Sequence, residues 1–426
     1  MHRRTFVTSS LLGTAAAWAG ANDRIRSAVI GVGGRGMDHI DNLLRAGNSE
    51  VAVLCDPDQE RLAKGAAVVL ERTGKSPRLE ADLRRVLEDK SVDVVSIASC
   101  NHWHALSTVL ACQAGKHVLI EKPLSHTFEE GRRMVEAARK YNRIVQGGTQ
   151  RRSSGGYRKA IQLIHDGVIG DVYLARWLLM NPRKPIGFKQ PEAPPANLNW
   201  DLWLGPAPKQ PYHANLVHYN WHWFWDFGGG EMCNNGPHFV DVARWGMRKK
   251  MPVRITSSGG RYAWKDQAQT PNTQTAIWEF EDGTRMQGEL RNHHTPGEET
   301  GWYFYGSKGA LYISDGGKGG PDNVKGVYKV YLNGSKTPEP DMGRLDDIDH
   351  HSNFLSAVRA GKRELLVDEI EELHLSTVPC LLATISYRLG RELMFDPAAQ
   401  RFTGDDQANR MLSRESRAPY SLPEKL

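Results

Sequence analysis

Six residues near the start of the chain have the spacing of a dinucleotide-binding loop: Gly31-Val32-Gly33-Gly34-Arg35-Gly36. In such a loop Gly31 allows a tight turn, Gly33 lets the backbone approach a pyrophosphate, and Gly36 allows a helix to pack closely on a strand. Asp56 follows twenty positions after Gly36. Its carboxylate can accept hydrogen bonds from an adenosine ribose and repel a 2′-phosphate. These residues, Gly34 and Arg35 included, predict a nicotinamide dinucleotide site that favours NAD over NADP.

A second group that could do chemistry is Lys122, in the tripeptide Glu121-Lys122-Pro123 directly after an apolar run. An ammonium group at the carboxyl end of a parallel strand lies where ligands bind, and it can stabilise a developing alkoxide beside a nicotinamide. The alternative is a surface lysine that pairs with Glu121. The residues alone leave both interpretations open.

Short apolar runs alternate with amphipathic segments from residue 25 to residue 148, and this alternation predicts a doubly wound parallel sheet, a Rossmann fold. Thr127 with Glu130 three residues later is typical of a helix start. The expected strands are 27–30, 51–55, 92–98, 118–120 and 144–147, and the expected helices are 37–45, 60–71, 81–87, 105–114 and 128–141.

These motifs resemble those of the glucose-fructose oxidoreductase and inositol dehydrogenase family, called Gfo/Idh/MocA. The matching features are the glycine loop, Asn101-His102-Trp103-His104, the segment 115–123 that ends in Glu-Lys-Pro, and a later glycine-rich stretch that ends in a histidine. The resemblance implies that Lys122 is the active-site lysine and that Asn101, His104 and Glu121 lie around the cofactor. It also implies a second domain built on a largely antiparallel open sheet.

By the same resemblance, His238 takes the proton of the substrate hydroxyl as hydride leaves the same carbon. A neutral imidazole, with a pKa of about 6.5, suits that task. The family commonly has Asp four positions before this histidine, whereas this chain has Asn234. An amide can orient a ring but cannot accept a proton. Either His238 works with Lys122 alone, or Asp226 or Asp241 supplies the missing carboxylate.

Aromatic residues concentrate around this motif, with five tryptophans between Trp200 and Trp225. Flat apolar faces beside polar side chains suit a ligand with C–H faces and many hydroxyls, which is a sugar or cyclitol. The alternative is that these aromatics anchor a long loop or an oligomer interface. The predicted substrate-binding residues are Arg151, Trp221, His222, Trp225, Asp226, Asn235 and His238, and the predicted catalytic residues are Lys122, His238 and Asn234.

The second domain, residues 149–345, also shows strand patterns of its own. A helix is expected at 157–165 and period-two strands at 172–178, 275–281, 285–291 and 328–332, with a long proline-rich loop at 182–211. Residues 346–426 predict helices at 351–359 and 368–389, bent around Pro379, and then an extended end. We expect this tail to brace the two domains.

The N-terminus has the features of an export signal rather than of a folded element. Arg3-Arg4 precedes an apolar stretch and a small-residue cleavage site that ends at Ala21. This pattern predicts a twin-arginine signal over residues 1–21 and a periplasmic location. The NAD-binding Rossmann domain is then expected to cover residues 22–148. Five cysteines form no CxxC motif or Cys/His cluster, so no metal site is expected.

The 426-residue composition excludes several classes of protein. The net charge of +6 arises from scattered basic residues with acids between them, so no nucleic-acid stripe is expected, and no stretch is long and apolar enough to span a membrane. We therefore expect an NAD-dependent sugar dehydrogenase, with position 3 of a pyranoside favoured by resemblance. The alternatives are an NAD-dependent glycoside hydrolase and a non-catalytic NAD- and sugar-binding protein. A homo-oligomer, dimer or tetramer, is expected by analogy.

Overall fold

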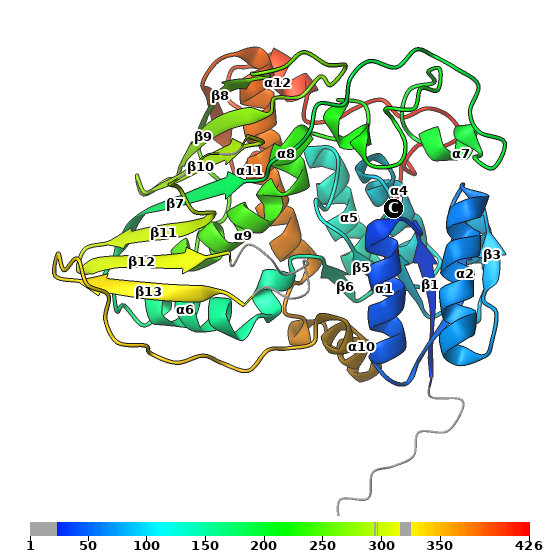
Figure 1. Ribbon diagram of the computed structural model, residues 1–426, viewed down its shortest axis with the longest axis horizontal. Coiled ribbons are helices and arrows are strands. Elements are labelled where there is room, and N and C mark those ends of the chain that lie inside the picture. Colours follow the sequence, from blue (N-terminus) through cyan, green and yellow to red (C-terminus); the bar gives the residue numbers. More distant parts are fainter. Residues whose placement is uncertain (1–23, 294, 296, 316–324) are drawn as a thin grey trace, which may run out of the picture.

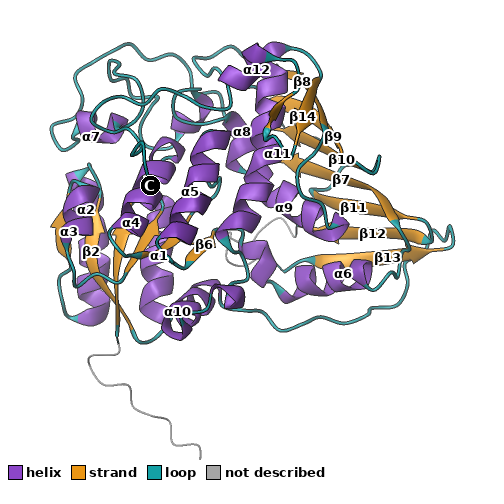
Figure 2. Ribbon diagram, turned by 180° about the vertical axis from the view of Figure 1, so that it is seen from behind, coloured by secondary structure: helices purple, strands orange, loops and turns teal. Residues whose placement is uncertain are grey.

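The computed structural model describes residues 24–293, 295, 297–315 and 325–426. Two sheets stand side by side, each with helices packed against it, and the C-terminal segments run back across both (Figure 1; Figure 2). The predicted signal peptide lies outside the described residues. No helix in the described part of the chain is long and apolar enough to cross a membrane.

The first sheet is parallel throughout, with strand order β3-β2-β1-β4-β5-β6. The expected Rossmann fold is therefore present, and each predicted strand and helix of this domain exists. Its strands are β1 (Ile25–Ile30), β2 (Ser49–Cys55), β3 (Arg78–Glu80), β4 (Val94–Ile97), β5 (His117–Ile120) and β6 (Val145–Gly147). Its helices are α1 (Gly34–Arg45), α2 (Gln59–Thr73), α3 (Leu83–Glu88), α4 (Asn101–Gln113) and α5 (Phe128–Lys140).

Two helix starts in this domain follow from side-chain caps. Thr127 and Glu130 form the predicted capping box at the start of α5. Asp58 caps α2 by accepting hydrogen bonds from the backbone amides of Glu60 and Arg61. The edge strand β3 was not predicted because its three residues have no apolar alternation and are mostly exposed.

The second sheet has nine strands in the order β13-β12-β11-β7-β10-β9-β8-β14-β15, and only the central pair β7 and β10 is parallel. This is the largely antiparallel open sheet that the resemblance implied. Seven of its strands lie before the C-terminal segment: β7 (Val172–Met180), β8 (Arg254–Gly260), β9 (Thr273–Glu279), β10 (Arg285–Arg291), β11 (Gly301–Gly306), β12 (Gly309–Ser314) and β13 (Val327–Leu332). The other two, β14 (Leu393–Asp396) and β15 (Arg401–Phe402), come from the C-terminal segment. A turn at Asp282-Gly283 joins β9 to β10.

One face of this sheet is covered by α6 (Gly155–His165), α9 (Gly236–Met247) and α11 (Ile370–Leu389) (Figure 2). Trp177, Trp278 and Trp302 are fully buried beneath them. Helix α11 contributes to both hydrophobic cores, since Leu373 packs with the Rossmann strands and Val378 with the second sheet. The tail therefore braces the two domains, and α11 continues through Pro379.

The C-terminal end contains short elements that the sequence did not predict, and residues 411–426 follow them without helix or strand. After α10 (His350–Ala360) and α11, the chain forms β14 (Leu393–Asp396), β15 (Arg401–Phe402) and α12 (Asp406–Arg410). Strand β14 pairs with β8 and so extends the second sheet, and Phe395 and Phe402 are buried in its core. A strand of four residues is too short to show a clear alternation in the sequence.

The segment between β7 and α8 (Gly230–Asn234), residues 181–229, is the arm of this structure. It holds α7 (Trp200–Leu204) and a short 3₁₀ turn at Asn220–Trp223, and it lies over the Rossmann domain (Figure 1). The Asn197 amide donates to the Asp58 carboxylate over 2.8 Å, and the Asn199 backbone amide donates to the Pro57 carbonyl over 2.9 Å. The proline-rich loop is thus tied to the turn after β2.

Candidate active site

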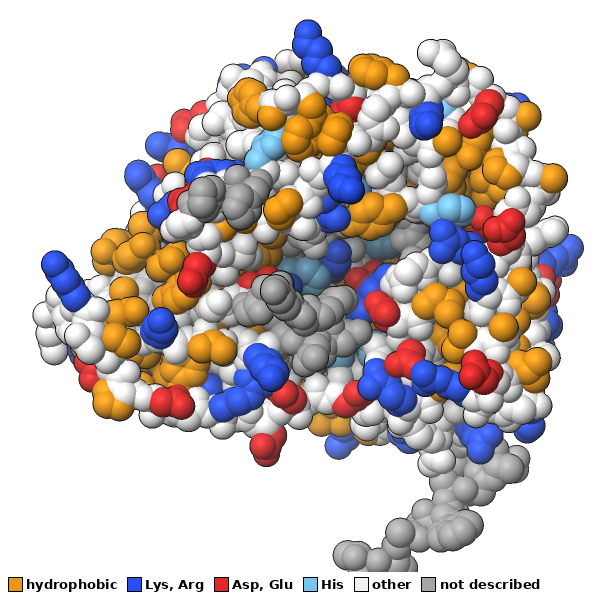
Figure 3. Space-filling view, in the orientation of Figure 1, with side chains coloured by type: hydrophobic (Ala, Val, Ile, Leu, Met, Phe, Trp, Pro, Cys, Tyr) orange, Lys and Arg blue, Asp and Glu red, His pale blue; other side chains and the backbone are white. Residues whose placement is uncertain are grey.

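A cavity of about 660 Å³ lies between the carboxyl edge of the Rossmann sheet and the second domain. On the surface it appears as a hollow between the two lobes, with basic, acidic and histidine side chains inside it (Figure 3). The predicted site residues that line it are Gly31, Gly33, Gly34, Arg35, Asp56, Asn101, His104, Glu121, Lys122, Arg151, Trp221, Asn234, Asn235 and His238.

The glycine loop joins β1 to α1, and its glycines differ in how much space surrounds them. Gly31 has a φ of +86°, in the left-handed region that favours glycine. A Cβ atom at Gly36 would lie 1.8 Å from the carbonyl oxygen of Gly31, so this position packs the helix on the turn and does not line the cavity. Cβ atoms at Gly33 and Gly34 would meet no atom within 4 Å. The start of α1 is therefore open to a pyrophosphate.

Asp56 closes the loop from the end of β2. Its Oδ2 accepts a hydrogen bond of 2.7 Å from the backbone amide of Val32, and its Oδ1 accepts one of 2.9 Å from that of Asp58. Burial raises the pKa of Asp56 to about 6. Arg61, Asp82 and Leu83 line the same end of the cavity. The loop and this carboxylate fit the pyrophosphate and ribose of a dinucleotide.

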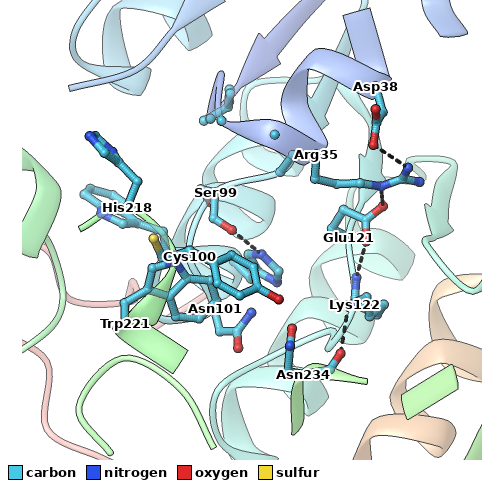
Figure 4. Close-up of a pocket in the computed structure, with 18 of the residues that line it drawn as sticks. Arg35, Asp38, Ser99, Cys100, Asn101, Glu121, Lys122, His218, Trp221 and Asn234 are labelled. Carbon is cyan, nitrogen blue, oxygen red and sulfur yellow. Dashed lines mark hydrogen bonds and ion pairs between the residues drawn. The ribbon is translucent and has the colours of Figure 1, made fainter. Parts of the chain in front are cut away.

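Glu121 and Lys122 stand at the carboxyl end of β5, at the centre of a polar network (Figure 4). Glu121 Oε1 accepts from Arg35 Nε over 2.6 Å, His39 Nε2 over 3.1 Å and Gln150 Nε2 over 3.1 Å. Burial raises the pKa of the Glu121 carboxyl, but the Arg35 charge, the hydrogen bond from His39 and the Lys122 charge together hold it well below its usual value. The Glu121 carboxylate therefore joins the glycine loop to the strand that carries Lys122.

Lys122 is turned into the cavity rather than paired at the surface. Its Nζ donates a hydrogen bond of 2.8 Å to the backbone carbonyl of Asn234, which lies in the second domain (Figure 4). Burial lowers the pKa of Lys122, and the Glu121 charge opposes this effect. The structure thus favours the active-site interpretation of Lys122 over the surface ion pair.

His238 lies in the first turn of α9 and is buried, with 5% of its surface exposed. Burial, together with the charges of Arg151 and Lys122, holds its pKa well below the usual value, so the imidazole is neutral. Its Nδ1 is buried and has no hydrogen-bond partner among the described residues. Because His238 also lines the cavity, Nε2 is the ring nitrogen left to contact a ligand.

His104 and Asn101 lie at the start of α4, which begins four residues before the predicted start of this helix at residue 105. His104 contacts the carbonyl oxygens of Pro123 through Nδ1 over 2.7 Å and of Ser99 through Nε2 over 3.0 Å. It therefore holds the loops after β4 and β5 together, beside Lys122. Asn101 is buried and lines the cavity next to Cys100.

Two asparagines line the substrate side of the cavity, and both are oriented by a carboxylate. Asn181 Nδ2 donates to Glu231 Oε1 over 3.1 Å, and Asn235 Nδ2 donates to the same oxygen. The Arg183 charge lowers the pKa of the buried Glu231 carboxyl, so it stays ionised. Both amides therefore direct their carbonyl oxygens away from Glu231, where they can accept hydrogen bonds from hydroxyls.

Three predicted substrate-binding residues do not line the cavity. His222 is buried beside the Tyr219 carbonyl, which Nδ1 contacts over 2.6 Å. The Trp225 ring lies 4.9 Å from the Arg388 guanidinium, and the exposed Asp226 accepts from Gln210 over 3.1 Å. Their clustering with Trp221 in the sequence suggested a shared role, but His222 is buried within the 3₁₀ turn at Asn220–Trp223, and Trp225 and Asp226 lie in the turn that follows it.

Neither proposed replacement for the family aspartate is in place. Asp226 points away from the cavity, as described above. Asp241 is fully buried in an ion pair with Arg152, with a shortest contact of 2.8 Å, and also accepts from Ser376 over 2.7 Å. His238 therefore has Lys122, and neither of these carboxylates, beside it in the cavity.

Sequence reasoning missed several residues of the cavity. Asp315, Thr300, Met180 and Asn181 come from the ends of strands in the second sheet, and Tyr219 comes from the arm. None belongs to a motif, because tertiary packing alone brings them together. The described residues contain no group of three or more His, Cys, Asp or Glu placed to hold a metal ion. All five cysteines are free, and two of them, Cys55 and Cys100, line the cavity.

Comparison with solved structures shows the same fold at low sequence identity. An aldose-aldose oxidoreductase from Caulobacter crescentus, complexed with glycerol, matches with a TM-score of 0.67 at 18% identity, over 87% of this chain and 100% of that one. The WlbA dehydrogenase from Bordetella pertussis, in complex with NADH and UDP-GlcNAcA, matches with a TM-score of 0.66 at 19% identity, over 88% of this chain and 99% of that one.

Curated relatives match over a shorter region. Inositol 2-dehydrogenase 3 of Saccharopolyspora erythraea is 37% identical over 163 residues, which are 38% of this chain and 46% of the relative. Inositol 2-dehydrogenase of Salmonella typhimurium is 31% identical over 171 residues, which are 40% of this chain and 50% of the relative. The chain thus spans about half the length of these relatives.

Two family models divide the chain between them. The NAD-binding Rossmann fold of the Gfo/Idh/MocA oxidoreductases matches residues 25–149, and the C-terminal alpha/beta domain of the same family matches residues 187–422, more than half of the chain. The first model describes the Rossmann domain, residues 25–149, as NAD-binding, and the glycine loop and Asp56 lie within this range. The chain belongs to the Gfo/Idh/MocA oxidoreductase family.

Proposed function

We propose that this protein is an NAD-dependent oxidoreductase that acts on a secondary hydroxyl, or the corresponding ketone, of a sugar, glycoside or cyclitol. Position 3 of a pyranoside is the favoured carbon. The observation that carries the proposal is the presence of the Lys122 ammonium and the neutral His238 imidazole in one cavity with the glycine loop. The curated relatives, several of them named inositol dehydrogenases, agree with a cyclic polyol as the substrate class.

The residues divide the chemistry of alcohol oxidation between them. His238 Nε2 accepts the hydroxyl proton, which a neutral imidazole can do and an imidazolium cannot. The Lys122 ammonium stabilises the negative charge that develops on the same oxygen. Bound NAD supplies the hydride acceptor. The substrate loses one proton and one hydride, so its carbinol carbon becomes a carbonyl.

The two asparagines of the substrate side suit this substrate class. Asn181 and Asn235 present carbonyl oxygens as acceptors, and the Trp221 ring offers an apolar face for ring C–H groups. Asn234 contributes its backbone carbonyl to Lys122 and so fixes the ammonium between the two domains. Asn234 therefore acts here through its main chain.

We further propose that the protein is exported with its cofactor already bound. The twin-arginine pattern at residues 1–21 supports export of a folded protein to the periplasm. NAD that is tightly held, and recycled by a second substrate, would suit a compartment that contains little free dinucleotide. The arm, tied to Pro57 and Asp58 beside the adenosine end of the cavity, supports slow release of the cofactor.

An oligomer is also part of the proposal. Among the described residues, no helix packs on one face of the nine-stranded sheet, which carries Tyr173, 57% exposed, and Ile277, 40% exposed, together with Tyr303, Tyr305 and Tyr331. Such an aromatic sheet face suits a second copy of the same chain in a dimer or tetramer.

The test begins with mass spectrometry of the purified, denatured protein, which should release NAD or NADH. A panel of pyranosides and cyclitols is then read for NADH absorbance and, for glycosides, released aglycone. Formation of NADH with a 3-ketopyranoside supports the proposal. Aglycone release without a change in absorbance would replace it with a glycoside hydrolase that oxidises its substrate only transiently. A protein that binds nucleotide but shows neither signal would be a binding protein.

A further inference from the structure

An arginine and an aspartate from distant parts of the chain form an ion pair on the wall of the cavity. Arg151 Nε lies 2.9 Å from Asp315 Oδ1, and Arg151 Nη2 lies 2.7 Å from Oδ1 and 2.9 Å from Oδ2. The guanidinium carbon of Arg151 also lies 5.2 Å from the ring centroid of Phe239 and 5.4 Å from that of Trp302. This bidentate, stacked geometry holds the pair in one orientation.

The two carboxylate oxygens of Asp315 accept different numbers of hydrogen bonds. Oδ1 accepts from Arg151 Nε, from Arg151 Nη2 and from the Tyr157 hydroxyl, the last over 2.8 Å. Oδ2 accepts only from Arg151 Nη2 among the described residues. Asp315 lines the cavity, and its side chain is 18% exposed. Oδ2 can therefore accept a hydrogen bond from a ligand in the cavity.

The pair also sets the charge of this side of the cavity. A guanidinium on the wall, alone, would attract a carboxylate, since arginine binds carboxylates through two parallel hydrogen bonds. Here Asp315 already accepts the hydrogen bonds that Arg151 could donate to a ligand carboxylate, and its Oδ2 presents negative charge to the cavity. A ligand carboxylate would meet a like charge, whereas a ligand hydroxyl could donate to Oδ2.

We propose that Asp315 is a specificity residue that makes the cavity select neutral polyhydroxy rings and reject sugar acids that carry a carboxylate on the ring. This proposal rests on the proposed function, because it concerns the substrate of the same site. Asp315 also places on the substrate side a carboxylate that can accept a hydrogen bond from a hydroxyl. The family aspartate would supply such a group at position 234, where this chain has Asn234. Asp315 does so from the end of β12, far from α9 in the sequence.

The test compares two ligands that differ at one group. Methyl β-D-glucopyranoside carries CH₂OH where methyl β-D-glucopyranosiduronate carries a carboxylate. Binding of each to the NAD-loaded full-length protein is measured by calorimetry for the wild type and for Asp315→Asn. The wild type should bind the glucoside about tenfold or more tightly than the glucuronide, and Asp315→Asn should gain about tenfold or more in glucuronide affinity.

Three further variants serve as a surface control, a double variant and a substitute for Asp315→Asn. Asp405→Asn removes the partner of Arg391, a bidentate pair on the surface, and should behave as the wild type. The double variant Arg151→Gln/Asp315→Asn should show no gain, because the gain needs the released guanidinium. Asp315→Ser should show the same gain in glucuronide affinity as Asp315→Asn, and it replaces Asp315→Asn in the test if that variant does not fold.

The proposal is overturned if the wild type binds the glucuronide as tightly as the glucoside, if removal of the Asp315 charge brings no gain, or if the double variant gains equally. These outcomes differ from failure of the proposed function, which would appear as absence of NADH with every neutral polyol. Even if the wild type binds neither glucoside nor glucuronide, a glucuronide affinity that appears in Asp315→Asn supports the proposal, and one that stays absent contradicts it.

Discussion

The two halves of the cavity are built in different ways. The nucleotide half comes from one short stretch of chain, the turn between β1 and α1, together with Asp56 at the end of the neighbouring strand. The substrate half collects single residues from distant segments: Arg151 after β6, Asn181 after β7, His238 in α9 and Asp315 after β12. The first half depends on backbone conformation and the second on tertiary packing.

This difference predicts where function is fragile. In the nucleotide half the backbone makes the contacts, so a substitution acts mainly by filling space that the cofactor needs. In the substrate half charged side chains are buried and held by partners, so removing one leaves the others unpaired. The following predictions separate the two halves, beginning with the largest effect.

The largest effect is expected at Lys122. Replacing Lys122 with Ala should lower kcat by about 10²–10³-fold, since it removes the cation that stabilises the developing alkoxide. The variant should still purify with its nucleotide, because the glycine loop is intact. Single-turnover formation of NADH and mass spectrometry of retained nucleotide measure the two properties. Lys64→Ala, at an exposed position of α2, is the control. A kcat within threefold of the wild type would contradict the assignment.

Two glycines of the loop should respond in opposite ways. Gly34→Ala should leave the melting temperature unchanged or raise it, because Ala stabilises helices by about 1 kcal/mol relative to Gly, but it should weaken NAD binding by about tenfold. Gly36→Ala should destabilise the fold by about 1–3 kcal/mol, because its Cβ would overlap the Gly31 carbonyl. Thermal unfolding and NAD titration distinguish them. Equal behaviour of the two variants would argue against an open pyrophosphate site at Gly34.

A smaller effect is expected from pH at Asp56. Because its pKa is raised to about 6, the carboxylate is charged above that pH and neutral below it. Repulsion of a 2′-phosphate should therefore weaken as the pH falls from about 7 to about 5, and the preference for NAD over NADP should shrink several-fold. Asp56→Asn should show little preference at any pH. Cofactor dissociation constants measured for both forms across this range provide the test.

The smallest effect is expected outside the cavity. Asp226→Asn should change kcat/KM by less than twofold, because its carboxylate is exposed and contacts Gln210. Steady-state kinetics with any accepted polyol are sufficient. A tenfold loss of kcat/KM would instead indicate that Asp226 contacts the substrate, which would require the arm to rearrange when substrate binds.

Much of the nucleotide half was predictable, because its signals are local. The glycine spacing, the acid at the end of β2 and the Glu-Lys-Pro tripeptide all lie next to the strands that position them. In the substrate half the sequence predicted Lys122, Arg151, Trp221, Asn234, Asn235 and His238, all of which line the cavity. Asp315 and Asn181 have no local pattern, and they enter the cavity because β12 and β7 end beside α9.

The errors have the same origin. His222, Trp225 and Asp226 were assigned to the substrate because they are close to Trp221 in the sequence, yet His222 is buried within the 3₁₀ turn and the other two lie in the turn that follows it. Asp241 lies three residues after His238 in the same helix, but it faces Arg152 and α11 rather than the cavity. Proximity in sequence indicated the right segment without indicating the right side chains.

The central claim is that neutral His238 and protonated Lys122 act together on one hydroxyl. The most direct test is the pH dependence of single-turnover NADH formation in the NAD-loaded wild type. Because the pKa values of both groups are lowered, the rate should stay level as the pH falls through 6.5, and should decline on the alkaline side below the usual lysine value of 10.5. His238→Ala should lose this rate by about 10²-fold or more at every pH. A rate that falls with a midpoint near 6.5, or a His238→Ala variant as fast as the wild type, would contradict the account.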